Sequence, residues 1–98
     1  MQASEARIET PHSERYLGQL CKHFAHRIPV TLNRDSGRID FPSGICQLAA
    51  EPGVLILRSE AEDFLALRVI EGIVGGHLER FAFREKFAVF WRPEPSQA

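Results

Sequence analysis

Residues Ile28 to Arg58, IPVTLNRDSGRIDFPSGICQLAAEPGVLILR, decide the fold of this 98-residue chain. Apolar residues alternate with others at 28, 30 and 32 and again at 39 and 41, a pattern typical of strands. Clusters of glycine, proline and short polar residues at 33–37, 42–44 and 51–53 favour turns. The stretch therefore predicts four strands joined by short turns, an antiparallel meander whose last two strands are 45–50 and 54–58.

A helix is expected just before this stretch. Apolar residues recur at three- and four-residue spacing and define one helical face that ends near His26: Tyr16, Leu17, Leu20, Cys21 and Phe24. Thr10-Pro11 fits its start, since threonine can cap free amides and proline needs none in the first turn. Pro29 disfavours helix beyond Arg27. Residues 6–10 are expected to form a short edge strand.

A second helix is expected after the meander. Ser59-Glu60-Ala61-Glu62 fits a capping box, in which the serine and the glutamate each satisfy an amide at the helix start. The residues that follow are apolar on most sides of the helix, which predicts a buried or sandwiched element: Phe64, Leu65, Leu67, Val69, Ile70, Ile73, Val74, Leu78 and Phe81. Phe87–Trp91 is expected to form a last strand, and residues 93–98 a tail.

The predicted order is β-α-β-β-β-β-α-β in one α+β domain spanning residues 1–98, with its core at about 6–92. We expect both helices on one face of a curved, mostly antiparallel sheet, because such a sheet can leave its other face in water. Each glycine in a helix is unfavourable, so Gly75-Gly76 needs a reason. We hypothesise that Gly18 and Gly75-Gly76 mark a close crossing of the helices, which would bring His23 and His77 together.

The composition excludes several classes of protein. Twelve basic and thirteen acidic residues give a net charge of −1, which argues against bulk attraction to nucleic acid or to an anionic membrane. No apolar run approaches the ~20 residues of a membrane span, and residues 1–10 do not resemble a signal peptide. Cys21 and Cys46 fit free, packed thiols in a reducing cytoplasm, with a disulfide between them as the alternative. We expect a cytoplasmic protein without a cofactor.

Histidines supply the candidate chemistry. His23 and His26 are three residues apart and so lie on one helical face, where two imidazoles can chelate a metal. His77 would be the third ligand, with Glu79 or Cys21 as a fourth. No diagnostic metal or catalytic motif supports this set. The alternative is that His26 is a solvated residue at a helix end.

His77 shares its helical phase with apolar positions expected in the core. It is therefore either a hydrogen-bonded polar residue of the core or, if it lines a cavity, a candidate acid–base group in a small enzyme. Arg80 could hold an anionic ligand, because its planar guanidinium suits carboxylates and phosphates. The candidate ligand-binding residues are thus His23, His77 and Arg80, and the candidate metal ligands are His23, His26 and His77.

Several phrases together resemble a bacterial family known only as domain of unknown function 2218, over roughly residues 6–92. They are Tyr16-Leu17, Leu20-Cys21-Lys22-His23-Phe24-Ala25-His26, Gly37, Phe41-Pro42-x-Gly44, His77-Leu78-Glu79-Arg80-Phe81-Ala82-Phe83 and Trp91. The resemblance implies a small protein with no assigned catalytic residue. It also implies an association with siderophore-interacting, flavin-binding reductases, and so a role near iron acquisition. His23, His77 and Arg80 lie within the sequence phrases on which the resemblance rests. The resemblance implies either a ligand-binding or a structural role for these three positions.

The leading expectation is a non-enzymatic binding or accessory module linked to iron or siderophore handling. Its ligand site would lie between the helices and the sheet, near the candidate histidines. The alternatives are a metal- or haem-binding protein that uses the histidine cluster, a small enzyme with His77 as acid–base, and a homodimeric module that pairs through its sheet. The expected partners are a small molecule or a siderophore-interacting reductase.

Overall fold

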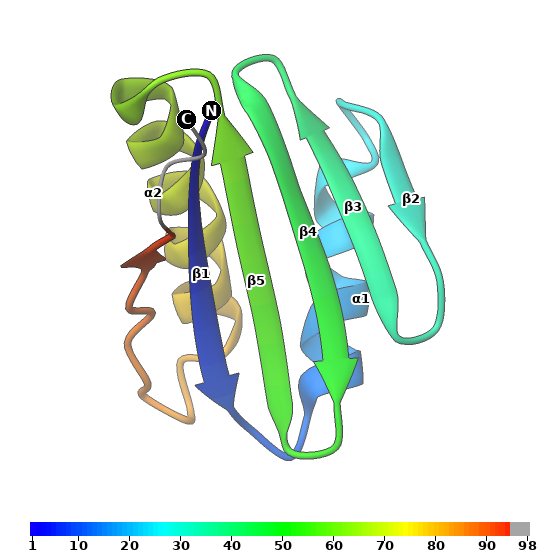
Figure 1. The fold of residues 1–98 in the computed structure, drawn as a ribbon. Helices are drawn as coiled ribbons and strands as arrows, with labels where there is room; N and C mark the ends of the chain where they lie inside the picture. The colour runs from blue at the N-terminus through cyan, green and yellow to red at the C-terminus, as the bar shows by residue number, and fades with distance from the viewer. Residues whose placement is uncertain (95–98) are drawn as a thin grey trace.

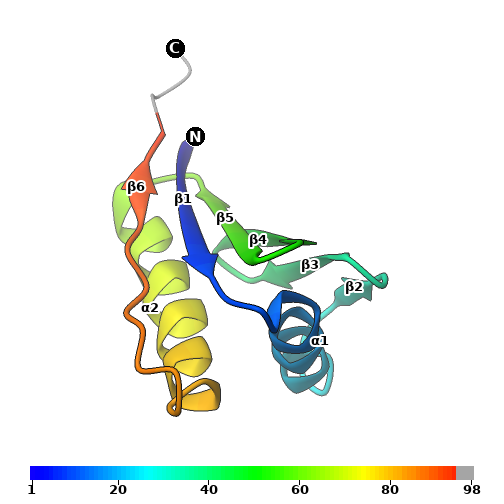
Figure 2. The same cartoon turned by 90° about the horizontal axis from the view of Figure 1, so that it is seen from below.

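The computed structural model describes residues 1–94 and has two helices packed against one antiparallel sheet. In chain order the elements are β1 (Gln2–Glu9), α1 (Ser13–Phe24), β2 (Val30–Leu32), β3 (Ser36–Phe41), β4 (Gly44–Glu51), β5 (Val54–Ala61), α2 (Phe64–Phe81) and β6 (Arg92–Pro93). The strands lie side by side in the order β2-β3-β4-β5-β1-β6. Both helices lie behind the sheet in Figure 1, and Figure 2 shows them on the same face. The predicted α+β class and element order are confirmed.

Alternation along the strands separates the two faces of the sheet. In β5, Leu55 and Leu57 are fully buried, whereas Ile56 and Arg58 between them are partly exposed. The buried members face the helices and form the core together with the apolar face of α1, where Leu17 and Leu20 are fully buried. Packing apolar strand residues against an amphipathic helix in this way is the arrangement that the period-two and period-3.6 patterns favour.

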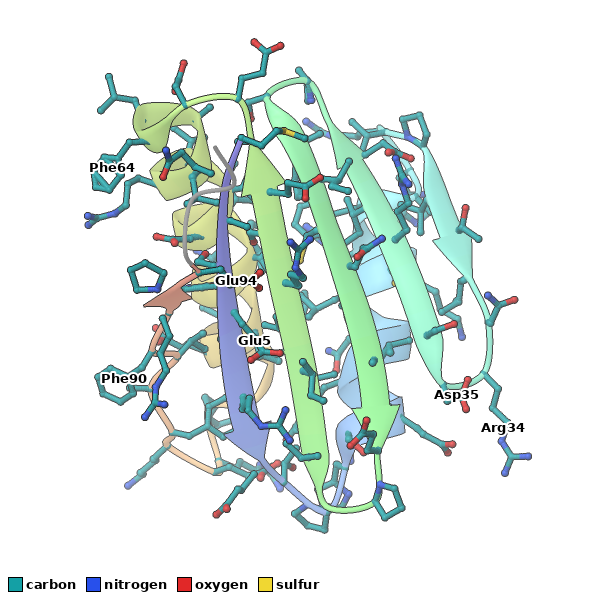
Figure 3. The ribbon with its side chains drawn as sticks, in the orientation of Figure 1. Glu5, Arg34, Asp35, Phe64, Phe90 and Glu94 are labelled. Carbon is teal, nitrogen blue, oxygen red and sulfur yellow. The ribbon has the colours of Figure 1, made fainter. Side chains whose placement is uncertain are left out.

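The open face of the sheet is polar and internally paired. Arg58 of β5 lies opposite Gln47 of β4 and Glu5 of β1 in the strand register. Its guanidinium donates hydrogen bonds to Glu60 at 3.1 Å and to Glu94 at 3.0 Å. Figure 3 shows Glu5 and Glu94 on this face. Partly exposed ion pairs of this kind keep a sheet face solvated and contribute little to stability.

Both outermost strands differ from their predicted bounds. The N-terminal strand is longer than residues 6–10, because β1 pairs along all eight residues with β5; β6 pairs only with Ser4 and Glu5, so residues 6–9 have a strand on one side only, as expected of an edge. The last strand is Arg92–Pro93 rather than residues 87–91. We call residues 87–91 the strap. The strap packs on α2 instead of joining the sheet, and its Val89 amide donates to the Glu79 carboxylate at 2.9 Å.

Both predicted helix starts are displaced. Residues 59–61 remain in β5, where they pair with β1 and β4, so the expected capping box does not form. Asp63 caps α2 instead, and its carboxylate accepts a hydrogen bond from the Ala66 amide at 2.8 Å. At the first helix, Thr10 accepts from the His12 amide, but α1 begins only at Ser13. Pairing with both neighbouring strands overrides the local capping signal.

The hypothesis that glycines mark a helix crossing is wrong. A Cβ added to Gly18 or Gly76 would meet nothing within 4 Å. Gly75 does need to be small, but because of the strap: its added Cβ would lie 3.3 Å from Trp91 Nε1. Gly72 also meets nothing within 4 Å, so α2 carries two glycines that no described contact explains. Each costs about 1 kcal/mol relative to alanine in a helix interior.

The second helix is not buried on all sides. Leu67, Ile70, Val74 and Leu78 are buried against the sheet and α1. Phe64, Leu65 and Val69 are instead 54%, 77% and 53% exposed. The prediction of a buried or sandwiched α2 is therefore correct for only part of its circumference.

Two further expectations from the sequence, the lack of a membrane span and the C-terminal tail, can be compared with the structure over residues 1–94. Within residues 1–94, no helix has the length and hydropathy needed to cross a membrane. The expected tail at 93–98 overlaps β6 at Pro93, and residues 95–98 lie outside the described part of the chain.

Candidate functional site

The structure brings His23 and His77 together. His23 lies in the last turn of α1 and His77 in the C-terminal half of α2, and their ring centroids are 4.7 Å apart with the planes tilted by 48°. The residues are far apart in sequence, so the contact depends on the packing of the two helices on the sheet. The proximity of these two histidines, which the sequence analysis predicted, is confirmed. Its cause is different, because aromatic side chains rather than glycines join the helices here.

Two phenylalanines contact the imidazole pair, and a third packs behind one of them. Phe24 lies 5.0 Å from His23 and 5.1 Å from His77, measured between ring centroids. Phe81 contacts the same two rings at 5.5 and 6.1 Å. Phe41 of β3 packs edge-on against Phe24 at 5.3 Å and so links the cluster to the sheet. Edge-to-face contacts of this kind favour fixed ring orientations, and the pair is therefore held in place rather than free on the surface.

A backbone hydrogen bond fixes the proton position of His77. Its Nδ1 lies 2.7 Å from the carbonyl oxygen of Ile73, one turn earlier in α2. A carbonyl oxygen only accepts, so Nδ1 carries a hydrogen and the neutral ring keeps a lone pair on Nε2. His77 is half-buried. The predicted hydrogen bond of His77 to the backbone is present, but the residue is not buried in the core, and Nε2 has no described partner.

The electrostatics of the site favour a neutral His23. Packing of its ring on the neighbouring aromatics lowers its pKa below the ordinary value of 6.5 by desolvation, although much of the side chain is exposed. The nearby groups His77, His26, Arg27 and Arg80 lower the pKa further, because positive charge disfavours imidazolium. The pair is thus flanked by cations, and none of the ion pairs among residues 1–94 includes His23, His77, Arg27 or Arg80.

The remaining predicted metal ligands lie elsewhere. Cys21 is fully buried in the core next to Gly37 of β3, and the Glu79 carboxylate is occupied by the strap. His26 is exposed in the turn after α1. Within residues 1–94, no three His, Cys, Asp or Glu side chains are grouped so that they could hold a metal ion. The metal set His23, His26 and His77 therefore stays a prediction, and the site itself offers two imidazoles.

The two cysteines are buried free thiols, as expected from the sequence. Burial raises the pKa of Cys21 to about 11 and that of Cys46 to about 12. Nucleophilic or metal-ligating cysteines need a lowered pKa. Both thiols therefore act as small apolar residues of the core.

Sequence reasoning missed a second polar cluster, at the opposite end of α1. The carboxylate of Glu85, just after α2, accepts hydrogen bonds from the Tyr16 hydroxyl and, at 2.9 Å, from Thr10 Oγ1. These bonds, that from Tyr16 first, lower the pKa of Glu85, and the positive charge of His12 and Arg15 adds to the effect. Burial and the Glu85 carboxylate raise the pKa of Tyr16. We call this cluster the Glu85 clamp. No local sequence pattern predicts the Glu85 clamp, because Tyr16 and Glu85 are 69 positions apart.

Comparison with known proteins gives a family but no activity. The NMR structure of PA4090 from Pseudomonas aeruginosa is similar, with a TM-score of 0.83 and 32% sequence identity over 98% of this chain and 100% of that chain. No curated protein sequence matches. A family model described as an uncharacterized protein conserved in bacteria, DUF2218, matches residues 5–92. With a whole-chain fold match and a family match over nearly the entire sequence, this chain belongs to the DUF2218 family of bacterial proteins.

Proposed function

We propose that this chain is a non-enzymatic binding module that holds a small anionic ligand on the His23–His77 pair. The observation that carries the proposal is the 4.7 Å contact between two imidazoles that have cationic neighbours and no ion-paired carboxylate among the described residues. Nε2 of His77 and the exposed guanidinium of Arg80 have no partner among the hydrogen bonds described, so both groups are accessible to a ligand.

Ligand binding at this site takes up a proton. The Ile73 carbonyl holds one proton on Nδ1 of His77, so the neutral ring can offer only an acceptor at Nε2. An anion needs donors, which Arg80 supplies always and His23 supplies when protonated. Desolvation and then the nearby positive groups lower the pKa of His23, and a bound anion would oppose the second of these effects. The bound state therefore favours imidazolium at His23, and affinity for an anion rises as the pH falls toward the lowered pKa of this residue.

A metal ion would give the opposite pH dependence. Metal binding needs neutral imidazole and competes with protons, so metal affinity falls as the pH falls. The sign of the pH dependence thus separates the anion module from the metal- or haem-binding alternative. An acid–base role for His77 in a small enzyme would need turnover in addition to binding.

The test is calorimetric titration of the full chain with citrate, ferric citrate and Zn²⁺ between pH 8 and 5.5. We expect citrate to bind more tightly at the lower pH. His23→Ala, His77→Ala and Arg80→Ala should each weaken binding about tenfold, the loss expected for one charge-assisted hydrogen bond. His12→Ala is the matched control, because His12 is an exposed histidine at the other end of α1. Tighter Zn²⁺ binding at high pH without any citrate binding would replace the proposal with the metal site.

An iron-handling role is part of the same proposal. Ferric siderophores with catecholate or carboxylate groups present an anionic surface that suits two imidazoles and two guanidinium groups. A siderophore-interacting reductase in the cytoplasm would then be the partner. Binding of citrate and ferric citrate with equal affinity would leave the anion site in place and remove the link to iron.

A further inference from the structure

The outward face of α2 carries apolar residues and glycines in one stripe. Leu65, Val69, Gly72 and Gly76 follow each other at four-, three- and four-residue spacing, which places them within about 60° of arc on a helix. Figure 2 shows the strap and α1 on opposite sides of α2, and Figure 3 shows Phe64 pointing outward from the start of the helix. Large apolar side chains thus stand at one end of the stripe and bare backbone at the other.

The glycine end is hollow. A Cβ on Gly72 or Gly76 would meet nothing within 4 Å. Gly75, which directly precedes Gly76, instead packs against the strap. A hollow of about 300 Å³ lies between these glycines and the strap, and its lining also includes Arg68, Glu71, Gly75, Glu79, Val89 and Trp91. Gly72 and Gly76 weaken the helix, and no contact inside residues 1–94 explains them. An occupant of the hollow would explain both.

The two ends of the stripe fit each other. In an antiparallel pair of helices, Leu65 of one copy would lie opposite Gly76 of a second copy, and Val69 opposite Gly72. Both pairs fall in one register, because the step from Leu65 to Val69 and the step from Gly72 to Gly76 are each four residues. A two-fold axis then forms both pairs twice, and close approach over glycine lets each apolar side chain fill a hollow.

Charge supports the antiparallel direction. Glu62 and Asp63 precede α2, whereas Arg80 lies in its last turn and Arg84 follows it. Glu79 and Glu85 lie at the same end, but their carboxylates accept hydrogen bonds from the strap and from Tyr16 and Thr10. An antiparallel pair sets the acidic start of each helix beside the basic end of the other, and a parallel pair would oppose like charges. We propose that the outer face of α2 is a homodimer interface, in which Leu65 and Val69 of each copy pack on Gly76 and Gly72 of the other.

The residues of the stripe fit a second copy of this chain better than they fit an unrelated helix. A foreign helix would need the same spacing of large and small residues in reverse order, and this chain already presents that order to its own copy. A single helix pair buries less than the ~1,600 Å² of a standard interface. The dimer is therefore weak and reversible, and its population depends on protein concentration.

The first experiment is sedimentation velocity on the full chain in a concentration series up to about 1 mM, a range that detects a millimolar Kd. We expect a monomer–dimer equilibrium in the wild type, and Gly76→Leu should raise the dimer Kd about tenfold or more. Gly76→Leu fills open space in the monomer and improves helix propensity, so its melting temperature should not fall. Gly18→Leu is the matched control: it lies in the equally open surface of α1 and should leave the dimer Kd unchanged.

The second experiment tests the register by cross-linking. Leu65→Cys combined with Gly76→Cys should give a covalent dimer on mild oxidation, because the new thiols face each other across the interface. Leu65→Cys alone should not, since its two copies would lie roughly 16 Å apart along the helix, beyond the reach of a disulfide. The native thiols are buried and need no removal. A wild-type monomer at every concentration, or single-cysteine cross-linking as efficient as that of the double variant, would overturn the proposal.

Discussion

The two ends of α1 use polar residues in opposite ways. At the N-terminal end, the Glu85 carboxylate takes both of its described hydrogen bonds from Tyr16 and Thr10. At the C-terminal end, His23 and His77 touch each other, and only one nitrogen of His77 has a described partner. The difference is in how far the polar groups are paired. The carboxylate of the first cluster is hydrogen-bonded within the chain, whereas Nε2 of His77 in the second cluster has no described partner. We call them the closed and the open end of α1.

The largest expected effect concerns the closed end. Glu85→Ala removes the acceptor of two hydroxyl groups, those of Tyr16 and Thr10, and both of these residues are buried. Hydrogen bonds to a charged group are worth about 1.5–3 kcal/mol, so we expect the free energy of unfolding to fall by about 2 kcal/mol. Urea denaturation measures it. If citrate affinity fell together with stability, the two ends would be coupled and the comparison would fail.

Acid sensitivity is the next effect and also belongs to the closed end. The folded-state pKa of Glu85 lies below its ordinary value of 4.5, so the carboxylate contributes stability above pH 4.5. That contribution is lost as the pH falls through the folded-state pKa. Glu85→Gln should therefore flatten the stability profile below pH 4.5 relative to the wild type, as followed by urea denaturation. If the stability of the two proteins fell equally below pH 4.5, other carboxylates would account for the acid sensitivity.

The smallest effect sharpens the open end. The folded-state pKa of His23 lies below 6.5, so the unfolded chain takes up the proton first and stability declines as the pH falls below 6.5. Above that pH the ring is neutral in both states and contributes no slope. His23→Ala should remove this shallow decline, whereas Lys22→Ala, its exposed neighbour on α1, should keep it. Thermal melts at pH 8, 6.5 and 5.5 would show the difference. Equal slopes in the three proteins would contradict the assignment.

The sequence predicted the parts of the fold that depend on local pattern. Period-two alternation and turn clusters located the meander, and the spacing of apolar residues located α1. The errors arose where distant strands decide the outcome. Residues 59–61 carry a helix-cap signal but pair with β1 and β4, and residues 87–91 look like a strand but pack on Gly75. Backbone pairing and shape fit at these positions outweigh local propensity.

The candidate site was predictable in part for the same reason. Histidine is conspicuous, and the two helical phrases around His23 and His77 pointed to one region. Their contact follows from ring packing with Phe24 and Phe81, which helical spacing alone does not reveal. Glu85 has the opposite status: a single glutamate in a polar loop carries no signal, and its role depends on Tyr16, 69 positions away.

The position of β1 has a consequence for how the protein is made. β1 pairs along its whole length with β5, and its register partners lie between residues 54 and 61. During synthesis, Ala6 and Ile8 stay unburied until these later residues have been translated. Such long-range closure is slow, because chain entropy is lost before the contacts form. During that interval the apolar residues of β1 are exposed to a chaperone or to another nascent chain.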